Sequence, residues 1–357
     1  EKKSYIVPYN DAVLLLKKME PLIGKISNDS LKGYFLNLNT GLYYTNRNFE
    51  TALKYAIKSE AFNSEINNKY NLNSGRIDIG NIYYHTRNYD KAIIYFTQAK
   101  NYYKDQKDPN HKRAYIATLY SLGKTYLQLE NVQQLNATIT ESEDAIKILQ
   151  PKHQIFETAY LKYIKGGLAF LLIDYATAQD YFETSLPIIQ KNGDFTNQHV
   201  IYLYLGKIAW NQNQKATAVT YFNKIDRLFQ EKKFLNYELR ETYEYLITYY
   251  KETEQPKLQL EATERMIALN RQFEKEQHNI TKTLHNELDT KKLETEREQL
   301  HKQLKSNKNT YGFWLSLLGA GLLVLTAYSL WQDKEKKKFK TKFEGLLQKI
   351  QTEKQSE

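Results

Sequence analysis

The chain has 357 residues, a net charge of +10 and an isoelectric point near 9.2. It contains no cysteine, so no disulfide framework holds it together. Part of the positive charge lies in a C-terminal lysine cluster, where attraction to anionic lipid headgroups accounts for it. No long Lys/Arg stripe with interleaved aromatic residues occurs in residues 1–250, so this region does not read as a DNA-binding surface.

The first residue is Glu1 rather than methionine. Removal of an export signal would leave such a start, and so would a shortened expression product. We expect an exported chain whose residues 10–26 form one capping helix ahead of a larger array.

A recurring pair of helices follows, and no sustained alternation of apolar and polar residues predicts a sheet. The clearest copy spans residues 76–99. Gly80 lets two helices approach closely, Tyr83 fills the gap between them, and Ala92 permits the second crossing. Asn88 marks the turn between the two helices. Phe96 and Ala99 are expected to pack on the next unit.

This pattern resembles the tetratricopeptide repeat. Weaker copies follow at Gly123, Gly166 and Gly206, an earlier one includes Tyr43 and Ala52, and a degenerate last unit runs through Tyr243. The four glycines, counted from Gly80, are 43, 43 and 40 positions apart. The tetratricopeptide repeat typically takes 34 residues, so these units carry longer helices or loops. The resemblance implies an all-α solenoid of about six helical pairs over residues 1–256.

Most of the 30 tyrosines are assigned to packing between repeats. Aromatic and amide side chains on the first helix of each pair are expected to face the concave surface and to bind a peptide or a partner helix. Their lack of the Lys/Asn set of some tetratricopeptide proteins argues against capture of a peptide's terminal carboxylate. The alternative is that they merely solvate the groove. They are Tyr44, Asn81, Tyr84, His85, Tyr120, Lys124, Gln128, Tyr163, Lys207, Trp210 and Asn211.

Residues 257–310 are predicted to form a long charged helix. Pro256 ends the last recognisable turn, and residues 257–308 contain neither proline nor glycine. Apolar residues recur in steps of seven and, after a stutter, of seven and four, which predicts a coiled-coil seam between two chains. The alternative is a spacer helix folded against the repeats. The apolar positions include Met266, Phe273 and Ile280, then Leu293, Leu300 and Leu304.

Residues 311–332 are predicted to form a single transmembrane helix. Residues 311–331 carry no charge and, as a helix, span about 31 Å. Small residues recur every four positions at Gly312, Ser316 and Ala320, a face on which two helices could pack. A buried core helix is the alternative. The expected membrane-interface residues are Trp314, Tyr328 and Trp331, with Lys336, Lys337 and Lys338 just beyond.

Residues 333–357 are predicted to form a basic juxtamembrane helix in the cytoplasm. Six lysines follow the span within a short segment, against four basic residues in the preceding flank. The positive-inside bias then places the C-terminus in the cytoplasm and the array outside. The expected location is the inner (cytoplasmic) membrane, crossed once, with a periplasmic or extracytoplasmic N-terminal domain.

No catalytic motif occurs: there is no Walker-type glycine loop, His-Glu-x-x-His pair or Gly-x-Ser-x-Gly elbow. Of the seven histidines only His278, His285 and His301 cluster, all on the charged helix. We therefore expect no enzyme activity, no cofactor and no metal site.

The order of these parts is similar to that of membrane-bound flavobacterial transcriptional regulators, in which such an array precedes a cytoplasmic AraC-type helix-turn-helix domain. Residues 342–350 look like the linker into that domain, which the 26 residues after Trp331 do not contain. Contact with DNA would need that further domain.

The resemblance implies a single-pass sensor or adaptor. Its outer array binds a peptide or protein, and the long helix and span change the pairing of two protomers. A cytoplasmic, transcription-regulating module then responds. Two alternatives stay open: a membrane-anchored scaffold for envelope or secretion assemblies, and the input half of a histidine kinase.

Overall fold

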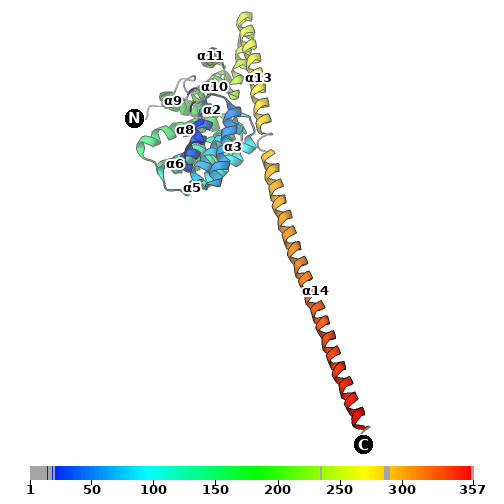
Figure 1. Ribbon diagram of the computed structural model, residues 1–357. Helices are drawn as coiled ribbons and strands as arrows, with labels where there is room; N and C mark the ends of the chain where they lie inside the picture. The colour runs from blue at the N-terminus through cyan, green and yellow to red at the C-terminus, as the bar shows by residue number, and fades with distance from the viewer. Residues whose placement is uncertain (1–13, 15–17, 19–20, 234, 285–289, 355–357) are drawn as a thin grey trace. The chain divides into compact units, whose positions relative to one another are not determined.

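The computed structural model describes residues 14, 18, 21–233, 235–284 and 290–354 (Figure 1). The chain divides into two compact units, Glu1–Leu288 and Asp289–Glu357. The capping helix expected at residues 10–26 falls largely outside the described residues. Within the described part every regular element is a helix, as predicted.

Helices of the first unit pack as consecutive hairpins (Figure 1). The first helices of successive pairs also contact one another, so they line one surface of the array. The elements are α2 (Asp29–Thr45), α3 (Phe49–Glu65), α4 (Lys69–His85), α5 (Tyr89–Lys104), α6 (Pro109–Gln128), α7 (Val132–Lys147), α8 (Pro151–Leu171), α9 (Tyr175–Lys191), α10 (Phe195–Asn211), α11 (Lys215–Lys232), the 3₁₀ turn η1 (Tyr237–Glu241), α12 (Thr242–Glu252) and α13 (Pro256–Leu284).

The hairpin turns share one design. In α3, α5, α7 and α9 an Asn or Asp caps the second helix by accepting a hydrogen bond from a backbone N–H three residues on, as Asn48 and Asn88 do, whereas α11 lacks such a cap. The residue just before each cap is left-handed, with φ of 58° at Arg47 and 61° at Arg87. Asn88 therefore lies at the turn predicted for it.

The extra length of the repeats resides mainly in long helices. The first helices α6 and α8 have 20 and 21 residues, and each begins at a proline that suits the first helical turn. The hairpin architecture of the tetratricopeptide repeat is kept, while its period lengthens.

Close approach within a pair occurs where a glycine faces an aromatic ring. A Cβ built on Gly80 would lie 2.5 Å from Cε1 of Phe96, and one built on Gly206 would lie 2.4 Å from Cε1 of Phe222. Both rings are fully buried, as is Ala92 on the opposing helix. The predicted roles of Gly80 and Ala92 in helix packing are confirmed, although Phe96 packs first within its own pair.

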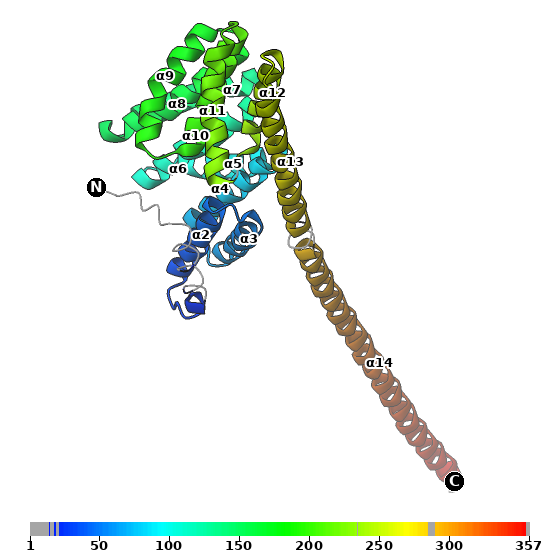
Figure 2. The same cartoon turned by 90° about the horizontal axis from the view of Figure 1, so that it is seen from above.

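Helix α13 belongs to the first unit and forms the sixth pair with α12. Figure 2 shows α11, α12 and α13 side by side, and α13 also contacts α3 near the start of the array. Its residues Leu269, Phe273 and Ile280 are buried. Two of the positions predicted as a seam between chains, Phe273 and Ile280, are thus covered by this chain itself. Their apolar spacing serves packing on the repeats, and the inter-chain interpretation of this part was wrong.

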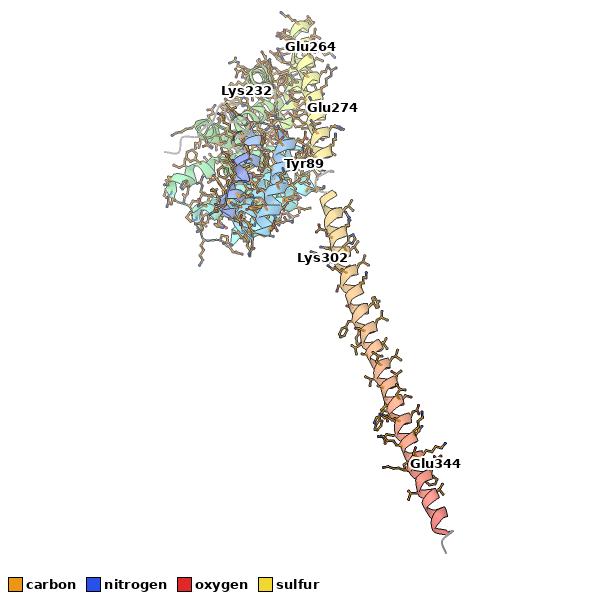
Figure 3. The ribbon with its side chains drawn as sticks, in the orientation of Figure 1. Tyr89, Lys232, Glu264, Glu274, Lys302 and Glu344 are labelled. Atoms are coloured by element: carbon orange, nitrogen blue, oxygen red, sulfur yellow. The ribbon has the colours of Figure 1, made fainter. Side chains whose placement is uncertain are left out.

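The second unit contains α14 (Thr290–Lys354), 65 residues long. Residues 285–289, where the predicted long helix would continue, lie outside the described part. All described side chains of α14 are exposed, and their sticks surround the ribbon at Lys302 and Glu344 (Figure 3). By length and composition its Glu296–Leu347 portion, with a mean hydropathy of 1.8 in its most apolar window, could cross a membrane.

Replacing Gly80 with Ala should lower the free energy of unfolding by about 1–3 kcal/mol, because the new methyl group collides with the buried Phe96 ring. Gly41 lies inside α2 with nothing within 4 Å of a Cβ, so Gly41→Ala should instead raise stability by about 0.5–1 kcal/mol. Chemical denaturation followed by circular dichroism measures both. Equal changes in the free energy of unfolding for the two substitutions would contradict the close packing of Gly80 on Phe96.

Candidate functional site

One tyrosine projects from each first helix onto the array's inner surface. We call Tyr44, Tyr84, Tyr120, Tyr163 and Tyr204 the tyrosine ladder. All except the buried Tyr163 are half-buried. Burial raises the pKa of Tyr44 to about 12, and it raises the pKa of the other four further. We call the partly exposed aromatic surface that these residues form, on the side of the array shared by the first helices, the wall.

Contacts along the ladder join successive repeats. The Tyr120 ring lies 6.1 Å from that of Tyr163 and 5.2 Å from that of Tyr160. Nζ of Lys124 lies 4.8 Å from the ring centre of Tyr84 and 5.9 Å from that of Tyr120. The wall therefore already holds one cation against its aromatic faces.

Glu238 of η1 adds to the raised pKa of every ladder tyrosine, after burial as the largest cause. The same carboxylate also opposes the lowering of the Arg47 pKa by burial. Burial of Leu235 and Leu239 anchors η1, and α10 contacts it. Within the described residues the Glu238 carboxylate has neither an ion pair nor a hydrogen bond.

A second carboxylate, Asp78, lies on the same side of α4 as Asn81 and His85, at helical spacing. It is half-buried and, among the described residues, has no hydrogen-bond or ion-pair partner. Desolvation raises its pKa from 3.8 to about 7. Together with Glu238, it also raises the pKa of Tyr44, and it raises the pKa of Tyr103 of α5 as well.

The two ends of the array meet in a polar cluster that we call the clasp: Arg47, His85, Asn236 and Glu276. Arg47 donates from Nη1 to Oδ1 of Asn236 over 2.8 Å and from Nη2 to Oε2 of Glu276 over 3.2 Å. Nε2 of His85 lies 3.4 Å from the same carboxylate oxygen. The clasp joins residues 189 and 229 positions apart.

Apolar and aromatic contacts surround the clasp. His85 packs on Phe49 with ring centres 3.8 Å apart, and Tyr237 packs on Phe273 at 5.0 Å. Cζ of Arg87 lies 4.3 Å from the ring centre of Tyr237. Ile280 of α13 joins the apolar cluster of the first two repeats. The last pair thus folds back onto the first pairs.

Burial and the contacts between the residues together determine the charges in the clasp. Desolvation lowers the pKa of Arg47 and of His85, and for His85 this outweighs its hydrogen bond with Glu276. Burial acts to raise the pKa of Glu276, but its contacts with His85 and Arg47 outweigh burial and hold that pKa below its usual value. The ion pair is Arg47–Glu276, while the histidine remains neutral at pH 7.

Six of the eleven predicted groove residues lie on or beside the wall: Tyr44, Asn81, Tyr84, Tyr120, Lys124 and Tyr163. His85 lies in the clasp instead. Nζ of Lys207 pairs with Glu241 at 2.9 Å. Trp210 packs against Phe222 and Tyr245, Asn211 donates to the Tyr175 hydroxyl, and the half-buried Gln128 ends α6.

The sequence interpretation missed Tyr204, Asp78, Glu238 and the pair Arg47–Glu276. One signal was present: Asp78 and Tyr204 each stand two residues before a repeat glycine, a position that was not assigned to the groove. The other three residues lie in turns or beyond the recognisable repeats, and no repeat register specifies their positions.

The predicted membrane residues all lie on α14 and are exposed. The Ser316 hydroxyl donates to the backbone carbonyl of Phe313 over 2.7 Å, so it is satisfied within its helix. The rings of Tyr328 and Trp331 stack at 5.9 Å, and Nζ of Lys338 pairs with Glu335 at 2.8 Å. Gly312, Ala320, Trp314, Lys336 and Lys337 complete the predicted set.

A hollow of about 760 Å³ lies between α5, α6 and α7, away from the wall. Its central carboxylate, Glu141, is engaged by Lys100 at 3.1 Å, by Lys104 at 3.6 Å and by the Tyr115 hydroxyl. Because this charge is already matched, the hollow is a weaker candidate than the tyrosine wall. The described residues contain no group of three or more His, Asp or Glu side chains that could hold a metal ion.

Replacing Glu276 with Gln should lower the free energy of unfolding by about 1–3 kcal/mol, because Arg47 would keep its burial and lose its counter-charge. Glu274 on the same helix is exposed (Figure 3), so Glu274→Gln should change stability by less than about 0.5 kcal/mol. Urea denaturation compares the two variants. Equal losses would show that the clasp does not join the ends.

Replacing Asp78 with Asn should stabilise the protein at pH 8 by about 1–3 kcal/mol and have little effect at pH 4. The unfolded chain releases this proton near pH 3.8, whereas the folded chain holds it to about pH 7. Stability is therefore lost as the pH rises between these values, and asparagine removes the loss. Unfolding curves over this pH range test the effect, and a variant less stable at pH 8 would contradict it.

The chain matches no protein-family model and no curated protein. Among solved structures it is similar to Cut9 of the APC/C hetero-tetramer Cut9–Hcn1, with 14% identity and a TM-score of 0.52 over 78% of this chain. That match spans 46% of the solved chain, less than half its length. A Rap protein complexed with Competence and Sporulation Factor gives 17% identity and a TM-score of 0.51, over 77% of this chain and 81% of the other. At these identities the likeness concerns the fold alone, which is a tetratricopeptide-type array of helical hairpins.

Proposed function

We propose that this chain is a single-pass membrane sensor or adaptor whose extracytoplasmic array binds a segment of peptide or protein along the tyrosine ladder. The supporting observation is the wall itself. Four half-buried tyrosines and the buried Tyr163 come from five successive first helices, so one partly exposed aromatic surface runs across five repeats. Rings supply contact area at low entropic cost, as recognition surfaces require.

The Rap protein of comparable fold is complexed with Competence and Sporulation Factor. This similarity supports the proposal in one respect: a hairpin array of this fold can hold a bound factor. The identity of the ligand of this chain is inferred from its own residues.

The clasp supplies a route for a signal. A segment seated on the wall would lie next to Glu238 of η1, and η1 packs on α13 through Tyr237 and Phe273. A displacement of η1 would therefore change its contacts with α13. Helix α13 is the last helix of the array and precedes α14 in the chain. A ligand that binds only when η1 shifts would thereby change the equilibrium of α13.

Membrane attachment through α14 is part of the proposal. Its uncharged run of 21 residues, its interface aromatics and the lysines beyond it agree with one span and a cytoplasmic C-terminus. The output would be a cytoplasmic module beyond α14, by resemblance an AraC-type transcription regulator. The small-residue face at Gly312, Ser316 and Ala320 would pair two spans.

A membrane-anchored scaffold is the second candidate. The ion pair of the clasp favours the scaffold, because an array that stays closed presents a binding surface and passes on no conformational change. The two functions differ in whether α13 moves when a partner binds. The input half of a histidine kinase would share the outer part of the sensor and differ in its output.

Photo-crosslinking tests the binding surface directly. Benzoylphenylalanine at Tyr84 should capture a partner in membranes of the native organism, whereas the same group at the exposed Ile94 of α5 should not, because Ile94 lies on a second helix. Mass spectrometry identifies the captured species. Capture from Ile94 and not from Tyr84 would place binding on the other side of the array and refute the proposal.

A further inference from the structure

We propose that two copies of this chain pair along α14 through one apolar face, which continues from the water-exposed helix through the uncharged run and out again. We call this face the apolar stripe, and its members are Leu300, Leu304, Leu318, Leu325, Phe339 and Leu346. The inference rests on the proposed function, because it takes the uncharged run as a membrane span. It goes further by naming the pairing face and the state in which that face is used.

The members of the apolar stripe share one seven-residue phase. From Leu304 onward they are 14, 7, 14 and 7 positions apart, and Leu300 lies four positions before Leu304. Steps of four and seven keep side chains on one face of a helix, and a repeat of seven is the pattern of helices that wind round each other. Helix α14 is continuous over Thr290–Lys354, so the phase is kept across the whole stripe.

Lipid can cover only the middle of the apolar stripe. The uncharged run spans about 31 Å as a helix, whereas Leu300 to Leu346 span about 69 Å. Leu304, Phe339 and Leu346 lie outside the run, and their side chains are 65%, 74% and 58% exposed. A row of large apolar side chains in water is unfavourable and marks a surface that a partner covers.

A second copy of α14 is the partner that covers both ends of the stripe. Leu304 precedes the proposed span and Phe339 follows it, so neither the array nor a soluble partner on one side can cover both. Every copy of the chain has the same orientation in the membrane. Two copies of α14 therefore run parallel, and each stripe residue meets its equivalent in the second copy.

Three polar residues interrupt the stripe beyond the run: Gln332, Glu335 and Lys342. Gln332 lies seven residues after Leu325, and a polar residue at such a position fixes the register of paired helices at a cost in stability. Glu335 pairs with Lys338 at 2.8 Å, so its charge is matched within its own helix. The long side chain of Lys342 can pack its stem while its charge stays in water.

The small-residue face of the span lies on the opposite side of α14. At about 100° per residue, Ser316 is turned by about 160° from Leu318. Pairing on the stripe and pairing on the small residues therefore exclude each other, and a change between them turns each helix by about half a revolution. We assign the stripe to the chain without ligand, because that pairing alone also covers apolar residues outside the span.

Cysteine cross-linking tests this face, because the chain has no native cysteine. Leu304→Cys, Leu318→Cys and Phe339→Cys sample the stripe before, within and after the run. Each full-length variant is produced in cells without added ligand, and the isolated membranes are oxidised with copper phenanthroline. We expect a covalent dimer from each variant on a non-reducing gel, since equivalent residues of a parallel pair lie close enough to form a disulfide.

The matched controls place cysteine two residues away from each stripe position, at Lys302→Cys, Ser316→Cys and Thr341→Cys (Figure 3 labels Lys302). These positions are exposed and lie about 160° round the helix, so their dimer fractions should be about tenfold lower. Equal cross-linking of the two sets, stronger cross-linking of the controls, or no dimer from the stripe overturns the inference.

The same fractions separate this inference from the proposed function. If the chain sediments with the membranes and the stripe gives no dimer, the inference falls and the proposed membrane attachment stands. If the chain remains in the soluble fraction, the proposed attachment fails, and the inference fails with it.

Discussion

The contact on which this architecture depends is the one between its two ends. Arg47, in the first described hairpin turn, meets Glu276 of the last helix of the array, and Ile280 of that helix enters the core of the first repeats. A helical solenoid is otherwise held by neighbour-to-neighbour packing, which leaves its ends independent. In this chain α13 contacts the first repeats, so the two ends of the array are joined.

Closure has a consequence for the inner surface. The 3₁₀ turn η1 contacts α10, α12 and α13, and the charge of its Glu238 acts on the tyrosines of all five first helices. Within the described residues Glu238 and Asp78 have no ion pair, whereas Glu276 of the clasp pairs with Arg47. Glu238 also acts on Arg47 and His85, so the wall and the clasp share one electrostatic environment.

Local chemistry made much of the fold predictable. Gly80, Ala92 and Asn88 specify a close helix pair and its turn, so the hairpins could be predicted from the sequence alone. The same register assigned Tyr44, Tyr84, Tyr120 and Tyr163 to the groove and missed Tyr204, and binding by these residues remains a prediction. The clasp could not be predicted, because it joins residues more than 180 positions apart and no local rule relates Arg47 to Glu276. Seven-residue apolar spacing fits a partner in another chain or in the same chain equally well, which is why the seam at Phe273 was misassigned.

A distance measurement between the two ends tests the closure most directly. The chain has no native cysteine, so spin labels at Thr45→Cys and Glu274→Cys, both exposed positions, report only on α2 and α13. We expect one narrow distribution at short distance in pulsed electron resonance, which broadens when Arg47→Ala is added. A broad distribution in the chain with Arg47 intact, unchanged by that substitution, would contradict it.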